Sequence, residues 1–285
     1  MRARRSCLSV PASPASKLAK GLTLQADEVI VDLEDSVAPE RKTEARAAVA
    51  DALRTAEWRA TTVSVRVNDM SSAWCEEDIR TVVGAGSRLD SVVVPKAERA
   101  ESLTEVDRLI TEAEPERAQQ VGIQALIETA RGLRDAHEIA SSSPRLEALI
   151  LGPADMSVSL GFPSPEEGTH WDFVRGAVLV AARAAGLQTI DGPYLQVDDL
   201  EGLEKSAMLA RKLGFDGKWA LHPAQVEILD NLFTPTAEEL GRAHAIFEAL
   251  DRGDGATTLD GEMIDEASRK RAEQLLARSR ASGAS

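Results

Sequence analysis

The stretch Val29-Ile30-Val31-Asp32-Leu33-Glu34-Asp35 joins a run of apolar, mostly β-branched residues to three carboxylates within four positions. An apolar run of this kind, bounded by polar residues, predicts a buried strand. The carboxylates have two interpretations. They are either the solvated turn after a strand or one wall of a site at the carboxyl end of a parallel strand. The other strands of the chain are needed to decide.

Seven further apolar runs follow the same plan and alternate with helical patterns. The helix after the opening stretch is predicted at residues 39–55, with proline at its start and alanines along it. Strands are predicted at residues 6–11, 28–33, 62–68, 91–96, 122–129, 146–155, 188–191 and 218–223. Eight β/α units predict an α/β fold of the (β/α)8 TIM-barrel type. A doubly wound open sheet is the alternative, and the missing GxGxxG turn after the first strand favours the barrel.

The chain beyond residue 235 has a different pattern. Helices are predicted at residues 236–250 and 265–280, with a turn-rich hinge at 252–256 between them. We therefore expect a catalytic TIM barrel at residues 1–235 and a C-terminal helical lid at residues 236–285.

The composition limits the partners. A net charge of -14 and a pI near 4.9 argue against nucleic acid and anionic lipid as ligands. The two cysteines, Cys7 and Cys75, form no CxxC pair, and no apolar run approaches the length of a membrane span. These features favour a cytoplasmic protein that contacts neither nucleic acid nor membrane.

Polar residues follow the ends of seven of the eight predicted strands. Chemistry in TIM barrels takes place at this end of the strands. The pattern therefore favours the site-wall interpretation of the opening acids. The residues are Asp32, Glu34, Asp35, Arg66, Asn68, Lys96, Glu128, Asp155, Asp191 and His222.

Glu128 and Asp155 are the strongest pair, because they follow neighbouring strands and their carboxylates can converge. Converging carboxylates repel unless one is protonated or a cation lies between them. Two carboxylates with water and substrate oxygens are typical of Mg²⁺, whereas no His/Cys cluster suggests zinc. The alternative is that both acids cap barrel helices.

Arg66 lies between Val65 and Val67 on an apolar strand. It is either a structural partner of Asp32 or Glu34, or a donor to a developing oxyanion, and both roles are compatible.

In the turn Gly152-Pro153-Ala154-Asp155, small residues let a ligand approach the backbone, where Ala154 and Asp155 supply N–H groups.

Seven segments in this order resemble the citrate lyase β-subunit-like family of the HpcH/HpaI aldolase superfamily. They are VDLEDSV (31–37), VRVN (65–68), VPK (94–96), LIETARG (126–132), GPAD (152–155), GFDGKWALHP (214–223) and DGEMID (260–265). The resemblance implies a TIM barrel with Mg²⁺ on Glu128 and Asp155, and Arg66 on the thioester or enolate oxygen. It implies further that Asp265 enters the site of a neighbouring subunit, in a homo-oligomer of three or six chains.

From these residues we expect a Mg²⁺-dependent carbon–carbon lyase or synthase. It would act on a 3-hydroxyacyl-CoA of the malyl-, methylmalyl- or citramalyl-CoA type, releasing an acyl-CoA and an α-keto acid. Arg66 and Asp265 would act on the reacting atoms, supported by Glu34 and Asp32. Substrate contacts are expected from Arg66, Lys17, Pro153, Ala154 and Lys96.

Two departures from the family pattern keep alternatives open. The turn after the first strand has Lys17 where relatives often carry arginine, and GPAD replaces the more usual GAED. GPAD resembles the aldolases that cleave free 2-oxo-acid aldols, whereas the LDGEMID tail favours CoA thioesters. The alternatives are an aldolase without CoA, a thioesterase, or a non-catalytic subunit that binds acyl carriers.

Overall fold

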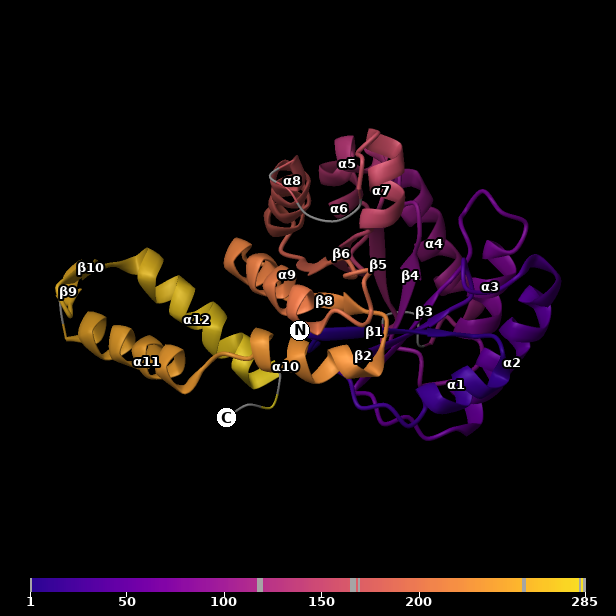
Figure 1. Cartoon of the computed structure of the whole chain (residues 1–285), viewed down its shortest axis with the longest axis horizontal. Coiled ribbons are helices and arrows are strands. Elements are labelled where there is room, and N and C mark those ends of the chain that lie inside the picture. The colour runs from indigo at the N-terminus through magenta and orange to yellow at the C-terminus, as the bar shows by residue number, and fades with distance from the viewer. Residues whose placement is uncertain are drawn as a thin grey trace.

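Eight parallel strands close into a barrel in the computed structural model of the chain (Figure 1). The structure describes residues 2–116, 120–164, 168, 170–252, 255–281 and 283. Every strand pairs with its sequence neighbours, and β1 also pairs with β8. The strands are β1 Ser6–Pro11, β2 Glu28–Asp32, β3 Thr62–Arg66, β4 Ser91–Val94, β5 Gly122–Ile127, β6 Leu146–Leu151, β7 Gln188–Asp191 and β8 Gly217–Ala220.

The TIM-barrel prediction is confirmed, and all eight strands lie where the sequence predicts them. Several predicted ranges extend too far at their carboxyl ends. Lys96 and Glu128 fall in the loops just beyond β4 and β5, and Asp155 lies in the first turn of α7 (Pro153–Leu160), which follows β6.

Helices cover the outside of the barrel (Figure 1). The predicted helix at 39–55 is a short 3₁₀ turn, Pro39–Arg41, followed by α2. The barrel helices are α1 Ala15–Gly21, α2 Lys42–Thr55, α3 Cys75–Val83, α4 Ala100–Ala113, α5 Ala130–Arg134, α6 Ala136–Ala140, α7 Pro153–Leu160, α8 His170–Ala184, α9 Leu200–Leu213 and α10 Val226–Phe233.

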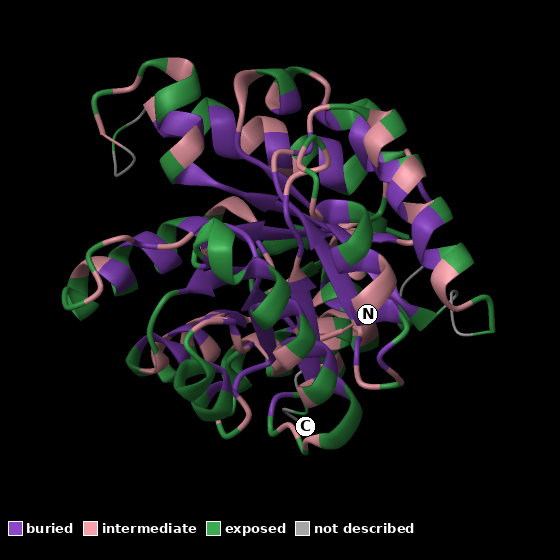
Figure 2. Cartoon of the chain, turned by 90° about the vertical axis from the view of Figure 1, so that its right-hand side faces the viewer, coloured by how far each residue is buried: buried purple, intermediate pink, exposed green. Residues whose placement is uncertain are grey.

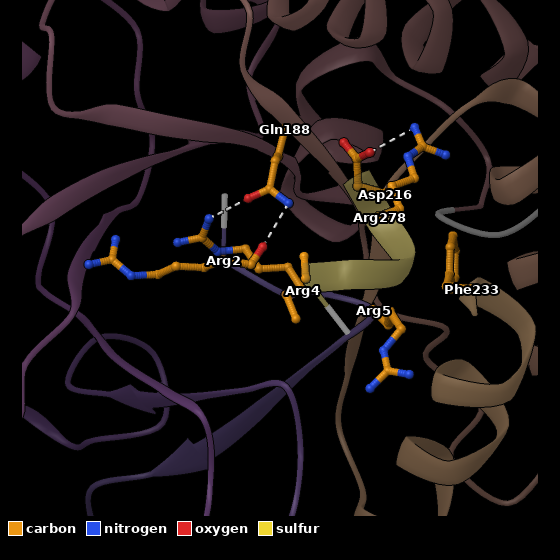
Figure 3. A pocket seen from close by; sticks show the side chains of 9 residues that line it. Arg2, Arg4, Arg5, Gln188, Asp216, Phe233 and Arg278 are labelled. Carbon is orange, nitrogen blue, oxygen red and sulfur yellow. Dashed lines mark hydrogen bonds and ion pairs between the residues drawn. The ribbon is translucent and has the colours of Figure 1, made fainter. Parts of the chain in front are cut away.

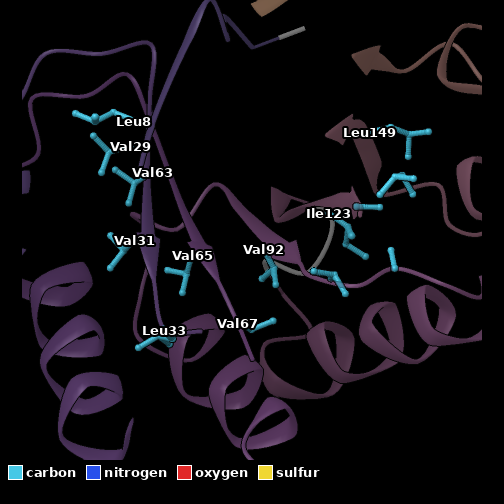
Figure 4. Close-up of a cluster of buried hydrophobic side chains, with 14 of the residues drawn as sticks. Leu8, Val29, Val31, Leu33, Val63, Val65, Val67, Val92, Ile123 and Leu149 are labelled. Atoms are coloured by element: carbon cyan, nitrogen blue, oxygen red, sulfur yellow. The ribbon is translucent and has the colours of Figure 1, made fainter. Parts of the chain in front are cut away.

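Alternate strand residues face opposite sides of the sheet, and this alternation builds two apolar layers. Val29, Val31 and Leu33 belong to the large cluster between strands and helices, part of which Figure 4 shows. Ile30 belongs instead to a smaller cluster inside the barrel, together with Cys7, Val93, Leu126, Ala148, Ile150, Ile190 and Trp219. The strands are therefore buried on both faces, as the central buried ribbons of Figure 2 show.

The opposite end of the barrel from the site, where the strands begin, is polar; we call it the floor. Glu28 accepts a hydrogen bond from Arg4 Nε at 2.8 Å, and hydrogen bonds from Ser64 and Gln124. Arg4 also donates to Gln188 Oε1 at 2.6 Å (Figure 3). The ion pair of Arg4 and Glu28 is thus buried and hydrogen-bonded, which is the arrangement that makes a buried charge tolerable.

The C-terminal extension, here called the arm, contains residues 236–281 and projects from the barrel (Figure 1). It consists of α11 Ala237–Asp251, β9 Thr257–Leu259, β10 Glu262–Ile264 and α12 Glu266–Ala281. Thr236 begins α11 with a capping box, so both predicted helices are confirmed. The β9–β10 hairpin is absent from our prediction, and Gly253 and Asp254 of the predicted hinge lie outside the described residues.

Two ion pairs attach the base of the arm to the barrel. Arg278 Nη2 lies 2.8 Å from Asp216 Oδ1, and Arg211 Nη2 lies 2.7 Å from Glu239 Oε2. At the other end of the arm Met263 is 69% exposed. Within the part of the chain that the structure describes, no helix has the length and apolar character needed to cross a bilayer.

Candidate active site

The pairing register of β2 and β3 brings the first two site residues together. Asp32 and Arg66 are register partners in this parallel pair. Arg66 donates from Nε to Asp32 Oδ1 and from Nη2 to Oδ2, both at 2.7 Å. Burial alone would raise the pKa of Asp32, but the guanidinium outweighs it and lowers that pKa. The carboxylate therefore holds Arg66 in a fixed bidentate orientation, so the predicted ion pair is confirmed.

Glu34 connects this pair to Lys96. Its Oε2 lies 3.0 Å from Arg66 Nη1, and its Oε1 accepts from Lys96 Nζ at 2.5 Å. Burial nevertheless raises the pKa of Glu34 above its ordinary value. The loop that carries Glu34 is held from behind by buried Lys42, whose Nζ donates to the carbonyls of Leu33 and Glu34 at 2.9 Å each.

Glu128 begins the loop after β5 and is 3% exposed. Its Oε1 accepts the backbone N–H of Lys96 at 2.7 Å. Burial raises the pKa of Glu128 to about 8, and the charges of Glu34 and Asp155 act in the same direction. This carboxylate is thus held in an environment that favours protonation or a nearby cation.

Asp155 lies in the first turn of α7 and faces the same cavity as Glu128. The volume of this cavity is about 140 Å³. It lies at the carboxyl ends of the strands, the expected position for a TIM-barrel site. Its lining residues are Ser9, Asp35, Arg66, Leu126, Glu128, Gly152, Pro153, Ala154, Asp155, Pro193, Trp219 and Leu221.

Seven of the predicted polar residues bear on this cavity, and acidic side chains outnumber basic ones. The basic residues are Arg66 and Lys96, and the acidic residues are Asp32, Glu34, Asp35, Glu128 and Asp155. Among the described residues no group of three or more His, Cys, Asp or Glu side chains is arranged to hold a metal. The donor set that remains is two carboxylates, which fits a hard divalent ion completed by water and substrate oxygens.

Three residues predicted near the mouth have structural roles instead. Asn68 Nδ2 donates to buried Asp78 at 2.6 Å and to the Leu33 carbonyl at 3.1 Å. The prediction of Asp191 at the mouth is wrong, because its carboxylate forms ion pairs with Lys218 at 2.5 Å and Arg175 at 3.3 Å. The inner apolar cluster contains Ile190 and Trp219, so strand alternation turns Asp191 and Lys218 outward.

His222 is the third of these residues. It caps a short 3₁₀ turn, where its Nδ1 accepts the N–H of Ala224 at 3.2 Å. This capping bond gives His222 a structural role at the end of β8.

Two predicted residues lie away from the cavity within this chain. Lys17 is exposed on α1 and does not line the cavity. Asp265 lies in the arm, where its Oδ1 accepts the N–H groups of Ala267 at 2.9 Å and Ser268 at 3.1 Å. Lys96 is at the edge of the site, with its side chain 32% exposed and its ammonium on Glu34.

Sequence reasoning missed part of the cavity wall. Leu126 and Trp219 belong to the inner apolar cluster and also line the cavity, where the Trp219 ring is 5.7 Å from the Arg66 guanidinium. Ser9, Pro193 and Leu221 carried no signal of their own. Strand alternation from Cys7 was the available clue to Ser9, because both point into the barrel.

The barrel sequence matches a known protein family. The profile of the family described as HpcH/HpaI aldolase/citrate lyase matches residues 5–223. The chain belongs to this family. The match covers all eight strands of the barrel and ends just after β8, before α10.

Curated relatives extend the similarity into the arm. The citrate lyase subunit beta of Haemophilus influenzae is 38% identical, over 98% of both chains. The L-malyl-CoA/beta-methylmalyl-CoA lyase of Cereibacter sphaeroides is 34% identical, over 96% of this chain and 94% of the relative. A solved structure of CitE from Mycobacterium tuberculosis, in complex with magnesium, acetoacetate and coenzyme A, is 31% identical with a TM-score of 0.78. The match covers 96% of this chain and 97% of the CitE chain.

Proposed function

We propose that this family member is a Mg²⁺-dependent carbon–carbon lyase or synthase that acts on a 3-hydroxyacyl-CoA of the malyl-, methylmalyl- or citramalyl-CoA type. The observation that carries the proposal is the cavity that Glu128 and Asp155 share beside Arg66, with its net negative charge. The relatives named as a malyl-CoA lyase and a citrate lyase subunit, and the CitE complex with magnesium, support it.

Glu128 and Asp155 would hold the metal ion. When bound there, Mg²⁺ supplies a Lewis acid that lowers the pKa of the substrate hydroxyl and orients the bond to be cleaved. In the cleavage direction a base would take the proton of that hydroxyl, and the hydroxyl oxygen would become the carbonyl oxygen of the keto acid. The bond to the carbon beside the thioester breaks, and its electron pair forms the enolate of the acyl-CoA.

Arg66 would stabilise the negative charge that develops on the enolate oxygen. Its guanidinium is only partly exposed, always protonated and held by Asp32 and Glu34, so it needs little reorganisation during the reaction. The first turn of α7 would bind the keto-acid carboxylate, with Pro153 against the substrate. The N–H groups of Ala154 and Asp155 are at positions where a helix has no internal acceptor for them.

Asp265 from a second copy of the chain would move the proton to or from the enolate carbon. The position of Asp265 in the projecting arm, away from its own cavity, supports a role in a neighbouring subunit of a trimer or hexamer (Figure 1). Closing the arm over the cavity would also exclude water.

The test is a condensation assay with the full chain and Mg²⁺, pairing acetyl-CoA or propionyl-CoA with glyoxylate or pyruvate. Mass spectrometry of the CoA species should find a hydroxyacyl-CoA that disappears with EDTA and in Glu128→Gln. Glu138→Gln is the matched control, since Glu138 is exposed on α6. Free CoA without the adduct would indicate a thioesterase, and no CoA product with any pair would overturn the proposal.

One observation favours an aldolase on free 2-oxo acids as the second candidate. Lys17, the residue expected to replace the usual arginine at a CoA phosphate, does not line the cavity. Cleavage of a hydroxy-oxo diacid without activity on any thioester would establish this candidate.

Subunit mixing tests whether Asp265 acts on its own barrel or on that of a neighbouring subunit. Asp265→Asn and Glu128→Gln should each be inactive alone. Co-expressed, they should regain activity if the arm works across an interface, because mixed oligomers then contain one complete site. No recovery in mixed oligomers would indicate that Asp265 acts on its own barrel or has no role.

A further inference from the structure

The backbone of Lys96 has a left-handed conformation, with φ of 47°. Among the described residues only Lys96 and Asp260 combine a positive φ with a side chain other than glycine. This region is unfavourable for L-residues with a Cβ, and it is rare for lysine. Such a residue persists only where surrounding contacts fix it, and these sites cluster where function needs a set geometry.

The turn at Lys96 directs its N–H to the site. This N–H donates to Glu128 Oε1 at 2.7 Å, and the next N–H, of Ala97, donates to the carbonyl of Leu126 at 3.1 Å. Two consecutive N–H groups therefore tie the loop after β4 to the end of β5. The Lys96 ammonium is directed elsewhere, to Glu34 at 2.5 Å.

Close packing on both sides keeps this arrangement in place. A Cβ on Gly132 would lie 2.4 Å from the Ala97 carbonyl oxygen, so α5 presses directly on the turn. A Cβ on Gly152 would lie 2.5 Å from Cβ of Glu128. Glu128 is thus held between the loop that follows β6 and the N–H of Lys96, which restricts where its carboxylate can point.

We infer that Lys96 is a positioning residue whose left-handed backbone, rather than its ammonium, sets the Glu128 carboxylate to receive a divalent cation. The inference rests on the metal site of the proposed function and deepens it. It separates two roles of one residue, with the backbone N–H acting on Glu128 and the side chain neutralising Glu34.

Two substitutions separate these roles, because both remove the ammonium. Lys96→Gly accepts a positive φ without strain, whereas Lys96→Val is β-branched and resists it. Mn²⁺ binding to the full chain, followed by electron paramagnetic resonance, gives a readout independent of turnover. We expect Lys96→Gly to bind Mn²⁺ at least as tightly as the native chain, since one cation has left the site. Lys96→Val should bind it about tenfold more weakly than Lys96→Gly.

Asp260 offers the matched control. It also has a positive φ, of 51°, but the residue lies in the arm and does not line the cavity. Asp260→Val introduces the same strain and should leave Mn²⁺ affinity unchanged relative to Asp260→Gly. If Lys96→Val does not fold, as judged by circular dichroism, Lys96→Ala replaces it and should lie between glycine and valine.

Equal Mn²⁺ affinity of the glycine and valine variants would overturn the inference. If both variants bound Mn²⁺ more weakly than the native chain, the effect would belong to the ammonium. A native chain that binds Mn²⁺ but makes no hydroxyacyl-CoA would overturn the proposed reaction and leave the role of Lys96 intact. A native chain that binds no Mn²⁺ would overturn both.

Discussion

The barrel buries charge at both of its ends, and the two ends treat it differently. At the floor, Glu28 accepts hydrogen bonds from Arg4, Ser64 and Gln124. At the mouth, Glu128 accepts the N–H of Lys96, and burial raises its pKa to about 8. The floor is neutralised within the chain, whereas the mouth keeps a surplus of negative charge. Floor contacts should therefore support stability and mouth contacts should support activity.

The largest expected effect separates these roles at Glu128. Glu128→Gln removes a carboxylate that we propose binds the metal, so kcat/KM in the condensation assay should fall by about a thousandfold or more. Its free energy of unfolding at pH 8 without metal should not decrease, because the buried charge is gone. Urea unfolding measures this second quantity. A variant that loses stability and activity together would show that the mouth is structural.

Arg4→Met makes the opposite test at the floor. It leaves Glu28 without its buried cation and should lower the free energy of unfolding by about 3 kcal/mol. The inner apolar layer separates the floor from the cavity, so kcat and KM measured below the unfolding transition should stay close to native. A lower kcat in fully folded protein would contradict the separation of the two ends.

The raised pKa of Glu128 predicts how metal binding depends on pH. Below about pH 8 the carboxyl is protonated without metal, and a cation must displace that proton. Apparent Mg²⁺ affinity should therefore rise about fiftyfold from pH 6 to pH 8 and then level off, since one proton is released. Isothermal titration in buffers of different ionisation enthalpy would count the proton.

The raised pKa of Glu128 also affects the stability of the metal-free chain. Metal affinity should rise with pH, whereas stability should fall. Between its ordinary pKa of 4.5 and about 8, Glu128 binds more proton in the folded than in the unfolded chain. The free energy of unfolding without metal should therefore decline as pH rises through this range. Saturating Mg²⁺ should remove the decline. A Mg²⁺ affinity that does not change with pH would show that the Glu128 carboxyl is already ionised without metal.

The smallest expected effect concerns the Arg66 clamp. Arg66→Lys keeps the positive charge but loses the bidentate bond to Asp32. We expect kcat to fall by about tenfold with little change in melting temperature, because lysine still neutralises the acids. Arg41→Lys, an exposed position before α2, is the control. An unchanged kcat would remove Arg66 from the reacting atoms.

Much of this architecture could be predicted from local pattern. Apolar runs such as 91–94 are too short for helices and rich in β-branched residues, so length and composition identified the strands. The acids after β2, β5 and β6 were predicted at the mouth for the same reason, because strand ends of a parallel barrel share one face. The errors follow from the same rule. Asp191 also ends a strand, yet strand alternation turns it outward to Lys218.

The sequence by itself determined the barrel, the arm helices and the candidate acids, because each depends on neighbours a few residues away. Only the tertiary structure decided which charges neutralise one another. The Asp32–Arg66 clamp depends on the register of β2 and β3, and the Lys96–Glu128 bond on a left-handed turn that Gly132 and Gly152 accommodate. The raised pKa of Glu128 arises from burial among residues from β2 to α7. Such properties belong to the packed barrel, since no single segment contains both partners.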